Sequence, residues 1–166
     1  MNIKNNNLKI HKNVFDNNYL EIEGGALLEG NIKISGAKNS ALVLMAASIL
    51  SKGQINLFNV PRISDVLNMS KILTAMGINI KSISNQLEIN TKEISSPSQD
   101  LFFDLFHALR VGFFCIGPLL ARFGKATVPL PGGCLIGSRP IDEHINSLKK
   151  LGVIFKFKNN YLSAEV

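Results

Sequence analysis

The feature that most constrains this chain is an internal repeat. Gly53 and Gly77, each placed where a helical pattern stops, have counterparts at Gly124 and Gly152. These pairs lie 71 and 75 residues apart, so the second copy holds four extra residues. Each copy has the pattern of a helix, a strand, a second helix and a β-hairpin. The sequence therefore predicts an α/β (α+β) fold made of two copies of one unit, at about 36–92 and 104–166.

Hydrophobic periodicity and turn residues give the expected elements within this frame. We expect the helix over 104–123 to bend at Gly117-Pro118, and the helix over 63–76 to begin at Ser64 or Asp65 as N-cap. Helices are predicted at 40–50, 63–76, 104–123 and 141–151. Strands are predicted at 20–23, 31–34, 54–60, 78–83, 86–90, 125–130, 153–158 and 161–166.

The ends and the composition limit the class of protein. Residues 1–18 are rich in Asn and Lys and predict a disordered extension that lacks the apolar core of a signal peptide, before a domain at 19–166. The longest apolar run, 111–121, is about half a membrane span. The net charge of +6 is spread along the chain, which favours anionic ligands and gives no nucleic-acid motif. We expect a cytoplasmic protein that contacts neither membrane nor nucleic acid.

The four extra residues of the second copy fall in the glycine-rich stretch 130–140, which holds Cys134 five residues before Arg139. A nearby guanidinium lowers a thiol pKa and attracts anions, so Cys134 is a candidate nucleophile or general acid. The alternative is a small apolar residue that fills a turn. Cys115 lies in an apolar helix and is expected in the core. Neither cysteine belongs to a CxxC pair, so no metal site is predicted.

Three further segments carry candidate binding residues. Lys38 and Asn39 stand where a strand meets a helix N-terminus, a corner that attracts phosphate or carboxylate, although an exposed loop lysine is an equal alternative. Arg110 lies in an apolar helix and needs an anionic partner, either a ligand or a structural carboxylate such as Asp104. Arg139 could bind phosphate or lie exposed, and Arg122 is expected to cap the C-terminus of its own helix.

The order of these motifs resembles the enolpyruvyl transferase family from about residue 20 to residue 166. The matching segments are Gly-Ala-Lys-Asn at 36–39, Gly-Pro-Leu-Leu-Ala-Arg-Phe-Gly at 117–124, Leu-Pro-Gly-Gly-Cys at 130–134 and Gly-Ser-Arg-Pro-Ile-Asp at 137–142. The cysteine loop resembles that of the UDP-N-acetylglucosamine branch. The resemblance implies an inside-out α/β barrel of six units in two domains, of which about two units are present here.

The resemblance also implies a reaction. The enolpyruvyl group of phosphoenolpyruvate would move to the 3-hydroxyl of UDP-N-acetylglucosamine, the first committed step of peptidoglycan precursor synthesis and hence of cell wall biogenesis, with no cofactor or metal. Cys134 would protonate the methylene carbon of phosphoenolpyruvate and would be the residue that fosfomycin alkylates. Lys38, Asn39 and Arg139 would bind phosphoenolpyruvate. The residues that would bind the UDP-sugar are Arg110, Arg139, Pro140, Ile141, Asp142 and Glu143.

Members of the family are about two and a half times longer than this chain. The remainder would supply a third unit, a second domain that packs with the strand at 20–23, and the catalytic base. We therefore expect a truncated or split N-terminal part with little turnover alone, which a separate C-terminal half-chain could complete. The alternatives are a non-catalytic module that binds a nucleotide-sugar or other anion, or a decaying remnant.

Overall fold

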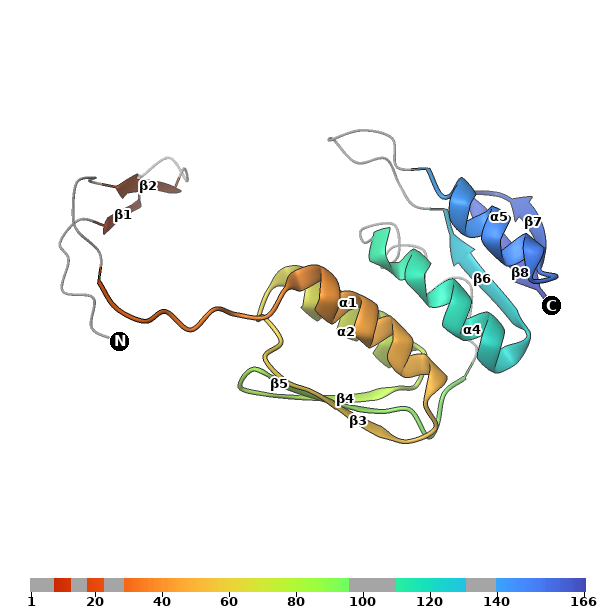
Figure 1. Ribbon diagram of the computed structural model, residues 1–166, viewed down its shortest axis with the longest axis horizontal. Coiled ribbons are helices and arrows are strands. Elements are labelled where there is room, and N and C mark those ends of the chain that lie inside the picture. Colours follow the sequence, from red (N-terminus) through yellow and green to blue (C-terminus); the bar gives the residue numbers. More distant parts are fainter. Residues whose placement is uncertain (1–7, 13–17, 23–28, 96–109, 131–139) are drawn as a thin grey trace. The chain divides into compact units, whose positions relative to one another are not determined.

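The computed structural model describes residues 8–12, 18–22, 29–95, 110–130 and 140–166 (Figure 1). Two of the predicted site residues, Cys134 and Arg139, lie outside these ranges. The chain forms two compact units, Met1–Ile34 and Ser35–Val166, which are described separately below.

The first unit contains a β-hairpin. Strand β1 (Leu8–Lys12) pairs antiparallel with β2 (Asn18–Ile22), with Leu8 opposite Ile22 and Lys12 opposite Asn18. Strand β1 lies inside the extension for which composition predicted disorder, and it gives β2 a partner within this chain. The strand expected at 31–34 does not form. Ile32 and Ile34 there are 73% and 80% exposed, and they pair with no described strand.

The first repeat opens the second unit and contains two helices and a three-stranded sheet. Its central strand, β5, is antiparallel to both of its neighbours, β3 and β4. Helix α2 crosses from β3 to β4, so these two strands run parallel on either side of β5. The elements are α1 (Lys38–Ala47), the 3₁₀ turn η1 (Ser48–Leu50), β3 (Gln54–Leu57), α2 (Ser64–Ala75), β4 (Asn79–Ile83) and β5 (Gln86–Asn90).

The second repeat has the same topology. Its sheet order is β6-β8-β7, which corresponds element for element to β3-β5-β4. The register corresponds as well, because Gln54 faces Asn90 in one sheet and Lys125 faces Glu165 in the other. The elements are η2 (Arg110–Cys115), α4 (Ile116–Phe123), β6 (Lys125–Pro129), α5 (Asp142–Lys150), β7 (Ile154–Lys158) and β8 (Tyr161–Glu165). No described strand joins the two sheets, so the barrel implied by the resemblance is not closed within the described residues.

Turn residues end the elements as their chemistry predicts. The β7–β8 hairpin turns at Asn159 and Asn160, both with positive φ, which suits the twist of a tight hairpin. Gly124 ends α4 with φ 68°, a left-handed conformation that favours glycine. The helix predicted over 104–123 is described from Arg110 onward, and it changes there from the 3₁₀ turn η2 to the regular helix α4 at Ile116, directly before the predicted bend at Gly117-Pro118. Proline has no N–H to donate to the preceding turn, so the regular helix begins at Ile116 and places Pro118 in its first turn.

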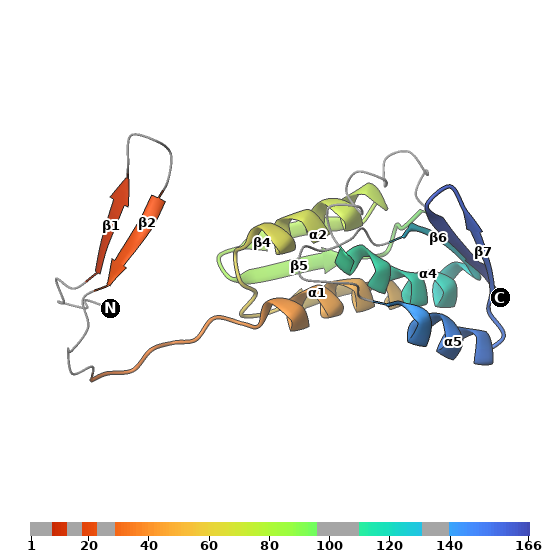
Figure 2. The same ribbon diagram turned by 90° about the horizontal axis from the view of Figure 1, so that it is seen from above.

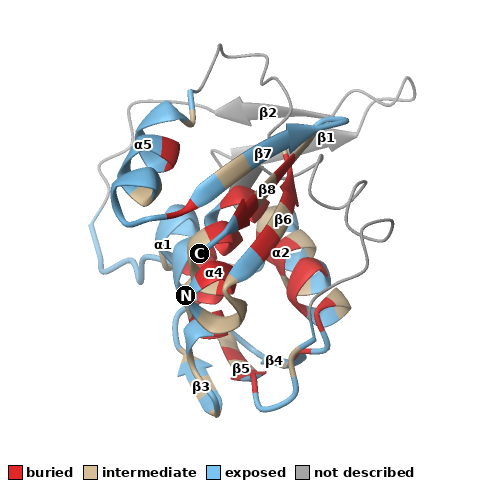
Figure 3. Ribbon diagram, turned by 90° about the vertical axis from the view of Figure 1, so that its right-hand side faces the viewer, coloured by how far each residue is buried: buried red, intermediate tan, exposed pale blue. Residues whose placement is uncertain are grey.

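The core of the second unit lies between its helices and sheets (Figure 3). Helices α1 and α2 pack on each other, η2 packs on α1, and α4 packs on η1, so the helices of the two repeats share one apolar interior. Cys115 has no exposed surface, which confirms its predicted place in the core. Side chains at most 2% exposed include Leu42, Met45, Ile49, Met69, Ile72, Leu73, Ile89, Leu119, Val128 and Leu162.

Candidate functional site

The first candidate feature is the N-terminus of α1. Ala37 is its N-cap, with φ −73° and ψ 128°, and no side chain caps the helix. The first hydrogen bond to a helix carbonyl runs from Ala41 N to Ala37 O, at 3.1 Å. The N–H groups of Lys38, Asn39 and Ser40 therefore lie ahead of the hydrogen-bonded turns, on exposed residues. This end of α1 has the donors and the positive dipole that an anion requires.

Lys38 adds a cation at this end of α1. Its Nζ lies 2.8 Å from Oδ2 of Asp65, which belongs to the first turn of α2, and the two side chains are 51% and 30% exposed. The sequence predicted Ser64 or Asp65 as the N-cap of α2. That prediction was wrong, since Ile63 is the N-cap and no side chain caps the helix. Asp65 instead pairs with Lys38 and brings a carboxylate to the candidate anion site.

The second candidate feature is the N-terminal end of α5. Pro140, Asp142 and Glu143 are exposed and Ile141 is half-buried. The two acidic residues occupy the first turn of α5, where they are favourable to the helix dipole. Residues Arg110, Cys134 and Arg139 complete the predicted set. The structure places the backbone of Arg110 at the start of η2, and the other two lie outside the described residues.

A cavity of about 350 Å³ adjoins this end of α5 and is lined by residues of η2, α4 and α5. The ring of His144 meets that of Phe113 edge-on at 5.7 Å between centroids, and that of Phe114 at 6.2 Å. Phe113 is buried, whereas Phe114 is 40% exposed. The sequence analysis did not predict this aromatic cluster. The only link to the predicted site is that His144 directly follows Glu143. The lining residues are Phe113, Phe114, Ile116, Gly117, Glu143, His144, Ser147 and Leu148.

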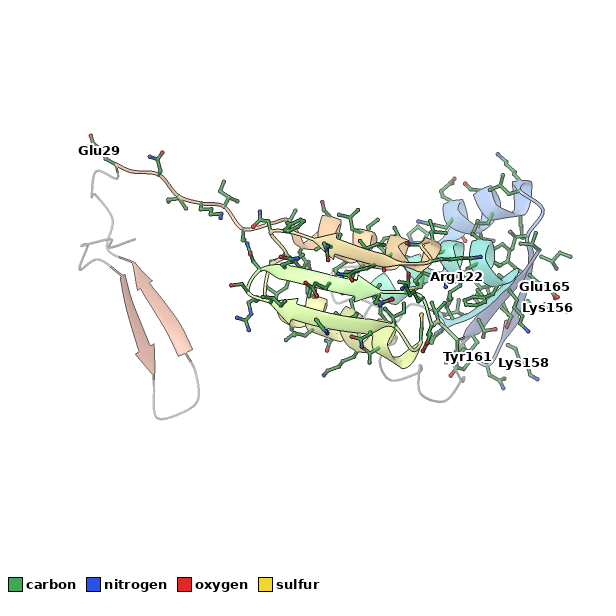
Figure 4. The ribbon with its side chains drawn as sticks, turned by 90° about the horizontal axis from the view of Figure 1, so that it is seen from below. Glu29, Arg122, Lys156, Lys158, Tyr161 and Glu165 are labelled. Carbon is green, nitrogen blue, oxygen red and sulfur yellow. The ribbon has the colours of Figure 1, made fainter. Side chains whose placement is uncertain are left out.

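Arg122 does not cap its own helix, contrary to the sequence prediction. Its guanidinium donates to the backbone carbonyls of Ile49 at 2.9 Å and Thr91 at 2.8 Å, and also to that of Ser51. Figure 4 shows the labelled Arg122 between the end of the first repeat's sheet and α4. The carbonyl of Leu120 in the last turn of α4 accepts instead from the N–H of Gly124, at 2.8 Å. Arg122 therefore joins the two repeats.

The one cysteine that the structure describes, Cys115, is a free thiol buried in the core. Burial raises the pKa of the Cys115 thiol from its ordinary value of 9.0 to about 12, because the apolar interior disfavours the thiolate. A thiol that stays protonated near neutral pH is a poor nucleophile. Of the two cysteines, Cys134 alone remains a candidate for chemistry.

A second, larger cavity of about 1040 Å³ lies between α2 and the β4–β5 hairpin, and none of the predicted site residues lines it. Among the described residues, no group of three or more His, Cys, Asp or Glu side chains could hold a metal ion. None of the helices in the described ranges reaches the length and hydropathy needed to cross a bilayer.

The sequence profile of one known family, described as EPSP synthase (3-phosphoshikimate 1-carboxyvinyltransferase), matches residues 22–166. Among individual proteins, the chain is 56% identical over 138 residues to UDP-N-acetylglucosamine 1-carboxyvinyltransferase 2 of a strain of Prochlorococcus marinus. That match covers 83% of this chain and 32% of the relative. UDP-N-acetylglucosamine 1-carboxyvinyltransferase of Parasynechococcus marenigrum is 46% identical over 89% of this chain and 34% of its own length. The chain thus spans about a third of the length of the curated relatives it matches.

A solved structure shares the fold. The enolpyruvyl transferase NikO from Streptomyces tendae superposes with a TM-score of 0.68 and 19% sequence identity, covering 86% of this chain and 31% of that one. The mixed α/β arrangement described above is therefore one that an enolpyruvyl transferase adopts.

Proposed function

This chain belongs to the EPSP synthase family, and on that premise we propose that it forms one wall of an enolpyruvyl-transfer site. The acceptor would be UDP-N-acetylglucosamine, which the names of the relatives at 45–56% identity contain. The donor would be phosphoenolpyruvate and the site of transfer the 3-hydroxyl of the sugar, as the resemblance to the enolpyruvyl transferases implies. The reaction would supply the first precursor of peptidoglycan in the cytoplasm. No cofactor is needed, because the proposed addition and elimination require only proton transfers and the loss of phosphate.

The observation that carries this proposal is the uncapped N-terminus of α1 with Lys38 beside it. Free backbone donors, the helix dipole and an exposed ammonium together suit a phosphate or carboxylate. In the proposed site, Lys38 and Arg139 bind the phosphate and carboxylate of phosphoenolpyruvate, and Asn39 donates a hydrogen bond there. Several fixed cations are required because two anionic substrates must be brought together.

The proposed reaction is an addition followed by an elimination. The sugar oxygen bonds to C2 of phosphoenolpyruvate while the thiol of Cys134 gives its proton to C3, and the hydroxyl proton passes to a base. The C2–O bond to phosphate then breaks, phosphate leaves with the electron pair, and C3 gives a proton back to the Cys134 thiolate, which restores both the double bond and the thiol. Cys134 can also add to C2 itself and hold the three-carbon unit as a covalent adduct.

The UDP-sugar would bind along the start of α5 and the start of η2. Pro140, Ile141, Asp142 and Glu143 form a continuous turn whose exposed residues can meet the uridine. Arg110 would face the diphosphate or sugar, and Arg139 would reach both substrates. The base is not among the residues to which we assign a role. We therefore propose that a separate C-terminal half-chain completes the site and that these 166 residues turn over little alone.

Phosphate release tests the proposal directly. The purified chain is incubated with phosphoenolpyruvate and UDP-N-acetylglucosamine, with and without the C-terminal two-thirds of a close relative, and with Cys134→Ser as the matched control. We expect release only with both halves, and loss of at least a hundredfold in the serine variant, since a general acid contributes about 10²–10⁴-fold. Full turnover by the chain alone would contradict the proposal that a C-terminal half-chain is needed to complete the site.

Binding and labelling separate the remaining outcomes. Isothermal titration of the chain with UDP-N-acetylglucosamine should show binding that Arg110→Ala weakens, and mass spectrometry should show fosfomycin attached to Cys134 but not to Cys115. Binding of the nucleotide-sugar without labelling would indicate a non-catalytic module. Absence of both would contradict the proposed function and favour a remnant.

A further inference from the structure

Arg122 makes an unusual set of contacts for a residue at the end of a helix. Two of its acceptors, the carbonyls of Ile49 and Ser51, belong to the C-terminal end of the α1–η1 segment, where backbone carbonyls lack helical partners. The third, the carbonyl of Thr91, follows β5. A guanidinium suits this role because its donors form a rigid planar fork, and its charge is favourable at a helix C-terminus.

The acceptors are themselves fixed. Thr91 is completely buried, and its hydroxyl donates to Ser51 O at 2.8 Å while Gly53 N donates back to it at 3.3 Å. The backbone N–H of Thr91 donates to Gly53 O at 3.0 Å. Arg122 therefore binds carbonyls of a segment that is held together by its own hydrogen bonds. These contacts attach the end of α4 to that segment of the first repeat.

The two helical segments that Arg122 connects run side by side in the same direction (Figures 1 and 2). Helix α1 contacts η2, and η1 contacts α4. The hydrogen bonds from Arg122 to Ile49 O and Ser51 O join the carboxyl ends of the two segments. The repeat places Arg122 twelve positions after Arg110 and Ser51 twelve positions after Asn39. Arg122 thus joins the carboxyl ends of the two segments. Asn39 and Arg110, at the matching amino ends, are both proposed substrate ligands.

We infer that Arg122 is a positioning residue that sets the axial register of α1 against η2–α4. Helices are stiff over this length, so fixing one end fixes the other, on the order of 20 Å away. The register in turn sets the spacing between Lys38 and Arg110. This role rests on the proposed function, in which those two cations hold the two substrates, but the register itself does not depend on ligands.

A distance measurement tests the register. Spin labels at Ser40→Cys and Phe114→Cys, both exposed positions near the amino ends, report the spacing in a Cys134→Ala background, because buried Cys115 does not react. We expect Arg122→Lys, which keeps the charge but cannot bridge three carbonyls, to broaden the distance distribution about twofold. Arg122→Ala should broaden it further. The matched control is Lys125→Ala, which removes an exposed cation three residues along.

Superposable distributions for the wild type and a folded Arg122→Lys variant would overturn the inference, and this variant decides the matter if Arg122→Ala does not fold. A second readout concerns ligands. In Arg122→Lys, phosphoenolpyruvate and UDP-N-acetylglucosamine should each bind alone within about twofold of wild type, while any enhancement of one by the other is lost. If the wild type binds neither ligand, the proposed function fails and the distance measurement still tests Arg122.

Discussion

Lys38 Nζ lies 2.8 Å from Oδ2 of Asp65, so the cation at the start of α1 is held by a carboxylate from the start of α2. A phosphate bound at the proposed site would compete with this carboxylate for the same ammonium. We therefore expect Asp65 to weaken anion binding at Lys38.

Asp65→Asn should strengthen anion binding. The amide keeps the shape of the side chain but removes the competing charge, and an exposed ion pair is worth at most about 1 kcal/mol, which corresponds to an about fivefold change in affinity. Titration with inorganic phosphate at low salt should show tighter binding by about two- to fivefold. Glu93→Gln, at the opposite end of α2 beside Gly77, is the matched control and should leave the affinity unchanged. Weaker binding in Asp65→Asn would contradict competition.

Much of the fold could be predicted because it depends on local patterns. Glycines, Asn-Asn and Ser-Asn pairs, and apolar spacing are readable within one element, and the repeat predicts that both copies share one order of helices and strands along the chain. The contacts of Arg122 could not be predicted in this way. Its partner Ile49 is 73 residues distant, and which carbonyls it meets depends on how two helices pack. Asp65 is a similar case, since its position fitted an N-cap and only tertiary structure placed it beside Lys38.

The site was predicted less completely than the fold. The sequence predicted a helix N-terminus beside Lys38 and Asn39 but began the helix at Ser40, two residues later than α1 begins. The exposed turn at Asp142 and Glu143 follows from the helix predicted at 141–151. The cavity beside His144 and Phe114 depends on the packing of α5 against η2. Neighbouring phenylalanines look alike in a sequence, although Phe113 is buried and Phe114 is not.

Cys115 should make the protein less stable in alkali. Its pKa is about 9 when unfolded and is raised to about 12 by burial, so between these values the unfolded chain releases a proton that the folded chain retains. Stability is full below pH 9 and falls with rising pH, by about 1.4 kcal/mol per pH unit. Urea unfolding at pH 8 to 10.5 measures the slope. Because lysines and tyrosines also titrate, the difference from Cys115→Ala is the quantity to compare, and equal slopes would refute this contribution.

Gly36→Ala should destabilise the segment that leads into α1. A Cβ at this position would collide with the backbone carbonyl oxygen of Asn59, which cannot move without displacing the chain after β3. We expect the free energy of unfolding to fall by about 1–3 kcal/mol and phosphate binding at Lys38 to weaken.

The matched control is Gly117→Ala in α4, where nothing lies within 4 Å of the added carbon. That variant should gain about 0.5–1 kcal/mol. A loss in both variants would point to helix effects instead of the collision.

Thr91→Val should destabilise the junction between the repeats. The two side chains have the same shape, so the change removes only the buried hydroxyl that donates to Ser51 O and accepts from Gly53 N. Valine leaves the half-buried N–H of Gly53 without this acceptor and removes one of the two described donors to Ser51 O, the other being Arg122, which costs about 1–3 kcal/mol. The counterpart in the second repeat is Val166, whose N–H donates to Gly124 O as that of Thr91 does to Gly53 O. Valine is therefore compatible with this backbone, and the loss of stability in Thr91→Val reports the contribution of the hydroxyl.

Denaturant unfolding measures this loss of stability, with Thr91→Ser, which keeps the hydroxyl, as the control. If serine proves as harmful as valine, the methyl group and not the hydrogen bond stabilises the junction.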